Sequence, residues 1–174
     1  ERFERIFGEP AHAHGAAGWQ MNVHALRQTQ QMGFHYASDS RGRGPFIPVY
    51  NAEIVACPQI PTTLPTLDEL IGRDGLTPDN VANHLLDLTS KPPAHGYGHV
   101  YTLHAELEGG KLAPVFDALL EGWKSQGYDL VPLRDIQQQL RADLLPRDEF
   151  IFGEIEGRSG TLSLQGPEFL AQAA

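Results

Sequence analysis

The segment Val100–Glu106 constrains the fold more than any other stretch of the chain. It is a short run of strand-forming residues that ends in His104 and Glu106, and helical patterns lie on both sides of it. This arrangement predicts a buried parallel strand in an α/β fold. Active sites of such folds form at the carboxyl ends of the strands. An imidazole in that place is a candidate proton donor or acceptor, and a hydrogen-bonded structural histidine is the alternative.

The rest of the chain predicts strands that alternate with helices. We therefore expect an α/β class with parallel strands, a C-terminal β-hairpin and a single domain over 1–174. Three prolines within 58–65 exclude a helix there, and Thr66–Glu69 has the spacing of a capping box. The expected strands are 34–38, 53–57, 100–104, 128–131, 150–155 and 161–164. The expected helices are 1–8 (ended by Gly8), 20–32 (ended by Gly33), 66–71, 77–88, 133–144 and one on the apolar stripe of Val115, Phe116, Leu119, Leu120 and Trp123, closed by Gly127.

Composition narrows the class of protein. A chain of 174 residues with 41% hydrophobic residues can bury one core, and its net charge of −9 argues against a nucleic-acid partner. Cys57 is the only cysteine, so an internal disulfide is excluded. The sequence contains neither a secretory signal nor an apolar run that could span a bilayer, and we expect a soluble cytoplasmic protein. It begins without Met, inside an amphipathic pattern, which predicts that it is part of a longer protein.

Three polar residues follow predicted strands: Asp39, Gln59 and His104. Their shared placement predicts one site. Arg41 and Arg43 lie beside Asp39, and a carboxylate next to cations can orient sugar or phosphate groups, although a structural turn is the alternative. The sequence also offers two further candidates with structural alternatives: Trp19 for stacking on a sugar ring, and Glu106 with Glu108 on the same face as His104.

Metal binding and nucleophilic catalysis are less well supported. His12 and His14 would share one face of a strand. His95 and His99 have a spacing that would bring both to one metal ion on a helix, but the two glycines between them make a helix unfavourable. We therefore favour histidines on surface loops and assign no metal ligand. Neither a Gly-x-Ser-x-Gly motif nor a phosphate-binding glycine-rich loop is present in the sequence.

Several motifs, in one order along almost the whole chain, point to a family. They are Ala16–Trp19, Ser38–Gly42 with Pro45 and Phe46, Gln59–Thr66, Ile71–Asp74, Tyr101–Glu106 and Arg158–Gly160. Together they resemble a deformylase group within the polysaccharide deacetylase (NodB-type) superfamily. The resemblance implies a distorted (β/α) barrel, of which this chain is the C-terminal portion, with the N-terminal metal-binding portion absent.

The resemblance also implies a chemistry. The superfamily uses a divalent metal, usually zinc, held by an Asp and two His, with a second Asp as general base. Those residues match nothing in this chain, so we expect no metal bound to it alone. His104 matches the general acid, and Asp39 matches the acidic residue that orients the catalytic groups. Trp19 lies at a motif that usually carries an Arg and two prolines, where this chain has Ala16–Gly18.

The implied reaction is removal of a formyl or acetyl group from an N-acylated amino sugar. The expected substrate is an undecaprenyl-phosphate-linked 4-formamido-arabinose, used in lipid A modification at the cytoplasmic face of the inner membrane. The chain alone is expected to be inactive. The expected substrate contacts, with the two arginines assigned to phosphate, are Trp19, Arg41, Gln59, Arg73 and Glu106.

Two alternatives remain open. One is a noncatalytic domain of the same fold that binds a sugar or a lipid head group. The other is a deacetylase that acts on a different N-acyl sugar. Without the first strands a barrel cannot close, so we expect pairing with the missing N-terminal portion or self-association across the open sheet edge.

Overall fold

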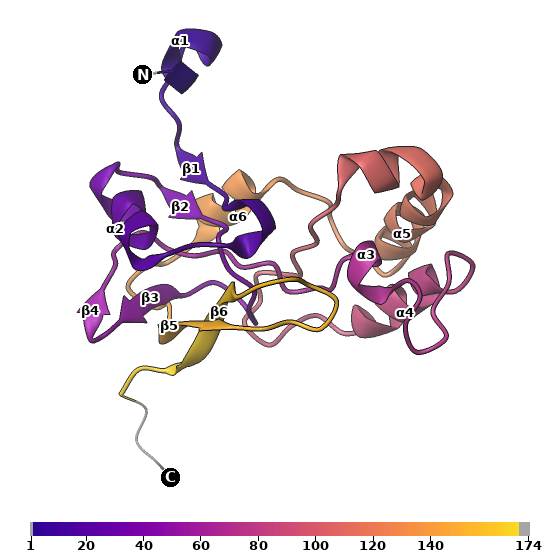
Figure 1. Cartoon of the computed structure of the whole chain (residues 1–174). Coiled ribbons are helices and arrows are strands. Elements are labelled where there is room, and N and C mark those ends of the chain that lie inside the picture. Colours follow the sequence, from indigo (N-terminus) through magenta and orange to yellow (C-terminus); the bar gives the residue numbers. More distant parts are fainter. Residues whose placement is uncertain (1, 171–174) are drawn as a thin grey trace.

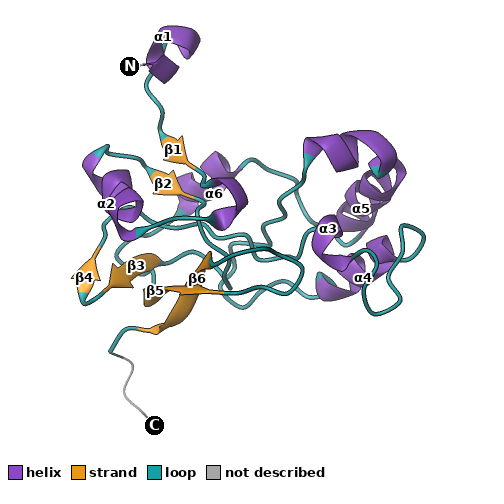
Figure 2. Cartoon of the chain, viewed as in Figure 1, coloured by secondary structure: helices purple, strands orange, loops and turns teal. Residues whose placement is uncertain are grey.

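The computed structural model describes residues 2–170 and consists of helices and strands in two regions (Figure 1). Two small sheets lie in one region, and the helices α3 (Leu67–Leu70), α4 (Val81–Leu88) and α5 (Ala113–Ser125) lie together in the other (Figure 2). The predicted α/β class is confirmed. The part of the chain that the structure describes contains no closed barrel. None of its helices has the length and apolar character needed to cross a membrane.

The N-terminal part follows the predicted order. Helix α1 (Arg2–Phe7) extends away from the rest of the chain and ends at Gly8, whose φ of +78° suits glycine. Glu1, the first residue of the predicted helix, lies outside the described residues. Next come β1 (Ala13–His14), a 3-10 turn η1 (Ala17–Trp19), α2 (Val23–Gln31) and β2 (Tyr36–Ala37).

The strands form two separate sheets. Strands β1 and β2 pair in parallel, with His14 opposite Ala37. The second sheet has the order β4-β3-β5-β6 and contains β3 (Ile47–Tyr50), β4 (Glu53–Ile54), β5 (Arg147–Gly153) and β6 (Leu162–Glu168). Only β3 and β5 are parallel there. The β5–β6 pair confirms the predicted C-terminal hairpin.

Strand β3 corrects the prediction for 40–48, because it begins within this segment, which was predicted as a loop. The glycines and prolines of 40–48 suggested irregular structure. Proline has no N–H to donate, but Pro48 can still take part in the strand through its carbonyl. This carbonyl accepts a 2.9 Å hydrogen bond from Val55 N. The carbonyl of Pro146 accepts from Ile47 N at 2.9 Å and begins the parallel pairing with β5.

The predicted strand Val100–His104 is also a correction: the segment has no regular secondary structure and belongs to neither sheet. The carbonyl of Val100 accepts hydrogen bonds from Thr63 N and Leu64 N at 3.0 and 3.1 Å. This neighbouring segment contains Pro61 and Pro65, which have no N–H to donate, so a continuous ladder cannot form. The predicted strand 128–131 is likewise irregular.

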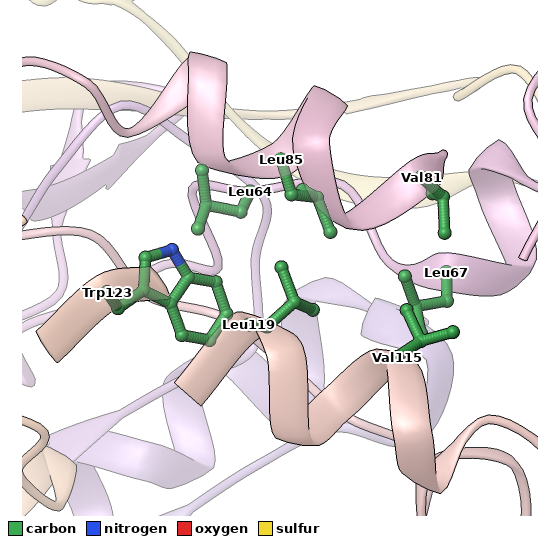
Figure 3. Close-up of a cluster of buried hydrophobic side chains, with 7 residues drawn as sticks. All are labelled: Leu64, Leu67, Val81, Leu85, Val115, Leu119 and Trp123. Atoms are coloured by element: carbon green, nitrogen blue, oxygen red, sulfur yellow. The ribbon is translucent and has the colours of Figure 1, made fainter. Parts of the chain in front are cut away.

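The helical region is held by a core between α4 and α5 (Figure 3). The helices meet closely because Gly122 of α5 lies against the side chain of Leu86. Helix α4 begins later than predicted, at Val81, because Asn80 accepts a 2.8 Å hydrogen bond from Thr77 N and closes a turn before it. The core side chains are Leu64, Leu67, Val81, Leu85, Val115, Leu119 and Trp123.

A second core lies between α2 and the sheets and supports the end of β2. Phe46 and Phe150 are its largest buried side chains, and Leu26 is its contribution from α2. Cys57 is also buried there, and burial raises the pKa of its thiol to about 11. This packing fixes the segment that continues into Asp39. The last helix, α6 (Leu133–Gln139), contributes Ile136 to a smaller core with Ile60 and Val100.

Candidate active site

His104 lies at the end of the segment Val100–His104 and faces an acid on α3. Its Nδ1 is buried, makes no hydrogen bond to the described residues, and lies 3.5 Å from Asp68 Oδ1. The side chain of His104 is 27% exposed, so the ring is reachable from outside while Nδ1 is not. Catalytic hydrogen bonds are often long in structures without substrate. The pair therefore has the arrangement in which a carboxylate orients a histidine, with Nε2 left for a substrate.

The backbone of His104 is fixed by the residues that follow it. The carboxylate of Glu108 accepts a 3.0 Å hydrogen bond from His104 N and a 2.8 Å hydrogen bond from the Tyr101 hydroxyl. Glu108 can reach back because the chain turns helical after His104 and continues into a π-helical turn, η2 (Leu107–Lys111). Burial and the contact with Glu108 raise the pKa of Tyr101. Tyr101 is thus a neutral hydrogen-bond donor.

This turn corrects the prediction for Glu106. On a strand, Glu106 and Glu108 would both face the side of His104. In the helical turn the two side chains lie in different environments: Glu108 is buried against the His104 backbone, and Glu106 is exposed. A shared face with His104 is not present.

Asp68 belongs to a group of two acids and two arginines around α3. Arg158 contacts both carboxylate oxygens of Asp68, at 2.9 and 3.0 Å. The neighbouring Glu69 accepts from Arg41 at 2.6 Å and from Arg158 at 2.7 Å. Burial alone would raise the pKa of Glu69, but the hydrogen bonds from Arg41, Arg158 and the Thr66 N–H hold it below its ordinary value. The last of these confirms the predicted capping box.

Trp19 is buried beside this group, which corrects its predicted role as a stacking surface for a sugar. The side chain is 4% exposed, and its indole N–H donates to Thr62 Oγ1 at 3.1 Å. The guanidinium carbons of Arg41 and Arg158 lie 4.7 and 5.0 Å from the ring centroid. Trp19 therefore supports the two arginines by cation–π contact.

The arginines predicted for a substrate phosphate are already paired. Arg41 is only 11% exposed and binds Glu69 and the Leu64 carbonyl. Arg73 pairs with Glu156 and is 28% exposed. Arg41 is therefore mostly buried and held by partners within the chain, which corrects its assignment to a substrate phosphate. Arg43, at 64% exposure, is more open but contacts Asp148 at 3.2 Å.

Asp39 and Gln59 are brought together as predicted, but away from solvent. Both are fully buried. Asp39 Oδ1 accepts from His14 Nδ1 at 2.7 Å and from Ala16 N at 2.8 Å, and Oδ2 accepts from the Gln59 amide at 3.3 Å. Gln59 Oε1 accepts from Asp39 N at 3.0 Å. Gln59 thus cannot touch a substrate, which corrects its assignment, and Asp39 can act only through His14.

The sequence reasoning missed Asp68, and it treated His14 only as a possible metal ligand. Asp68 lies inside the predicted capping box, where an acidic residue has a sufficient structural explanation. His14 could have been linked to Asp39 from the predicted parallel strands, because each residue lies at or just beyond the carboxyl end of its strand. The structure places Asp39 and Gln59 with His14, and His104 with Asp68, so the three predicted site residues divide between two places.

The donor set for a divalent metal is incomplete in this chain. Within residues 2–170, no three His, Cys, Asp or Glu side chains come together in a way that could hold a metal ion. The two His–carboxylate pairs each supply at most two ligands, and their carboxylates are used by other donors. The described residues therefore do not fit a metal by themselves.

Comparison with known proteins gives two curated relatives of one name. A Shewanella sediminis protein named probable 4-deoxy-4-formamido-L-arabinose-phosphoundecaprenol deformylase ArnD is 37% identical over 160 residues, 92% of this chain and 50% of that protein. A protein of the same name from Wigglesworthia glossinidia brevipalpis is 29% identical over 163 residues, 93% of this chain and 55% of that protein. No protein-family model matches the chain.

The fold also has a counterpart among solved structures. A Mycobacterium smegmatis protein described as a polysaccharide deacetylase superposes with a TM-score of 0.61 at 17% identity, over 88% of this chain and 57% of that one. The chain thus has the fold of a polysaccharide deacetylase. Within that class its sequence resembles the ArnD deformylases, and it spans about half the length of these curated relatives. The family resemblance expected from the motifs is confirmed.

Proposed function

We propose that this chain forms one half of a metal-dependent amide hydrolase that removes a formyl or acetyl group from an N-acylated amino sugar. The observation that carries the proposal is the buried contact of His104 Nδ1 with Asp68, in a chain that resembles ArnD deformylases over more than nine-tenths of its length. The proposed substrate is the undecaprenyl-phosphate-linked 4-formamido-arabinose that the relatives' name indicates. Its lipid carrier implies work at the cytoplasmic face of the inner membrane.

His104 is the proposed general acid. Water adds to the formyl carbon, and the C–N bond then breaks with its electron pair passing to nitrogen. The amine takes the proton of His104 Nε2, and formate leaves. Histidine is the side chain most often used for such a proton transfer. Asp68 faces the opposite nitrogen and stabilises the imidazolium that must donate.

The divalent metal, with zinc as our choice, would supply the activation of water in this reaction. Because residues 2–170 lack a three-ligand set, we propose that its ligands belong to the other half of the protein. The chain as given is then inactive alone, and its partner in the site is that other half.

Product analysis of the full-length protein tests this proposal. Formate released from a 4-formamido-arabinose lipid, lost with a chelator and restored by zinc, is the expected result. Acetate released from an N-acetyl sugar instead would favour the deacetylase alternative. If the protein is supplied with metal and binds the sugar lipid but releases neither acid, the proposal of a hydrolase is overturned. That result would favour a noncatalytic binding domain.

A further inference from the structure

The loop between β5 and β6 reaches across to α3, the helix that carries Asp68. Arg158, in this loop, contacts both oxygens of the Asp68 carboxylate and also donates to Thr66 Oγ1 at 2.6 Å. Its Nε donates to Glu69 at 2.7 Å. A guanidinium that holds a carboxylate through two nitrogens fixes the plane of the carboxylate as well as its distance.

The backbone of the loop is shaped for this contact. Arg158 N donates to the Ile155 carbonyl at 3.0 Å and closes a turn. Gly157, just before Arg158, has a φ of +89°, and a Cβ there would lie 3.2 Å from both Cα and the carbonyl oxygen of Glu69. Any side chain at this position would push the loop away from α3. Gln20 further ties the loop by donating to the Ser159 carbonyl at 3.3 Å.

We propose that Arg158 is a positioning residue for His104 and acts through Asp68. The proposal rests on the proposed function, since it requires His104 to be the proton donor. Asp68 Oδ1 is the shared atom: it lies 3.0 Å from Arg158 Nη2 and 3.5 Å from His104 Nδ1. With its plane held by Arg158, Asp68 keeps the hydrogen on Nδ1 of His104 and directs Nε2 to the substrate. Nε2 is then the nitrogen that carries the donated proton in the imidazolium and loses it in the reaction.

The pattern of contacts separates this role from simple stabilisation of the loop. Glu69, which is 3% exposed, already supplies Arg158 with a buried partner. The second carboxylate, that of Asp68, is 32% exposed and so is less buried than that of Glu69. Arg158 nevertheless contacts both of its oxygens. Asp68 Oδ1 also accepts a 2.6 Å hydrogen bond from Thr66 Oγ1 of the capping box. Beyond the capping box and Arg158, this oxygen faces a histidine nitrogen that is buried and has no hydrogen bond of its own among the described residues. The contacts therefore connect the β5–β6 loop to His104 through Arg158 and Asp68.

Nitrogen NMR of the full-length protein with 15N-labelled histidine tests the positioning without relying on turnover. At a pH where His104 is neutral, we expect the wild type to show hydrogen on Nδ1. Asp68→Asn and Arg158→Gln should both shift the population toward hydrogen on Nε2. Arg27→Gln is the matched control, because Arg27 pairs with Glu53 at an exposed site. An unchanged distribution in both test variants would overturn the proposal.

Kinetics supply the second measurement. Because a displacement of about 1 Å in a reacting group costs on the order of 100-fold in rate, we expect Arg158→Gln to lower kcat by roughly 10- to 100-fold with KM nearly unchanged. If that variant does not fold, Arg158→Lys keeps the charge but loses the two-point contact and should show a similar fall. Wild-type protein without turnover would contradict the proposed function. An active wild type with unaffected Arg158 variants would contradict this inference alone.

Discussion

His14 Nδ1 donates a 2.7 Å hydrogen bond to the carboxylate of Asp39, and the two residues come from the ends of the paired strands β1 and β2. Parallel pairing places these ends side by side, so the contact follows directly from the register. Asp39 is fully buried, whereas the His14 side chain is 39% exposed. The buried carboxylate of Asp39 thus holds the accessible imidazole of His14 by one nitrogen. In the second pair, the carboxylate of Asp68 faces one nitrogen of His104.

Asp39 should be important for stability. Replacing it by Asn puts an amide donor where the carboxylate accepts from His14, Ala16 or Gln59, so at least one buried donor loses its partner. We expect Asp39→Asn to lower the free energy of unfolding by about 1–3 kcal/mol, measured by urea denaturation. Asp143→Asn, at an exposed site, is the control and should change little. Equal stability of the two variants would contradict the arrangement of hydrogen bonds.

The α4–α5 core makes a second prediction. Leu119 is fully buried between the helices, so Leu119→Ala leaves a cavity and should cost about 2–5 kcal/mol of unfolding free energy. Leu88, at the end of α4, is 47% exposed. Leu88→Ala should cost no more than about 0.5 kcal/mol. A thermal or urea unfolding comparison in which both variants lose the same stability would show that the two helices do not pack as described.

Glu69 predicts a dependence of stability on pH. Its pKa is lowered in the native state, so below the ordinary value of 4.5 the unfolded chain binds the proton more readily than the native one. Its stabilising contribution is present above that value and is lost as the pH falls through the lower native pKa. Glu69→Gln leaves Arg41 and Arg158 without this charge and should cost about 3 kcal/mol at neutral pH.

The control for Glu69 is Glu53→Gln, because the Glu53–Arg27 pair is solvent-exposed. Unfolding curves recorded from pH 7 to pH 2 should show that the pH dependence becomes shallower in Glu69→Gln and changes little in Glu53→Gln. A wild-type protein that is most stable in acid would contradict the sign of the effect.

Cys57 predicts slow thiol chemistry in the native protein. Its side chain is 3% exposed and burial raises its pKa to about 11, so at pH 8 both access and thiolate content are low. Reaction with a chromogenic disulfide should be slow in buffer and fast in urea. Rapid labelling of native protein would show that the core between α2 and the sheets is open.

Local patterns in the sequence predicted much of the fold. Val115, Leu119 and Trp123 identified α5 because they recur at helical spacing, and all three are buried. Gly8 and Gly33 were recognised as helix ends and have positive φ. The capping box at Thr66 and Glu69 was found from spacing alone. Such signals depend on neighbours within about one turn, which the sequence displays directly.

The misses depended on partners that are distant in sequence. Strand propensity in 100–104 is real, but a strand also needs a neighbour that can donate along its length. The neighbouring segment donates from Thr63 and Leu64, and the prolines at 61 and 65 prevent a continuous ladder. Arg41 and Trp19 look like exposed binding residues in the sequence because the partner that holds the arginine, Glu69, lies far along the chain. Asp68 could not be recognised because its contact with His104 exists only where α3 and the segment Val100–His104 meet in the fold.

The most direct test of the account is the turnover of full-length protein carrying His104→Asn, supplied with metal and the formylated sugar lipid. If His104 delivers the proton to the leaving amine, kcat should fall by about 10²- to 10⁴-fold while substrate binding is retained. A variant that releases formate as fast as the wild type would contradict the assignment of His104 and, with it, the central claim for this site.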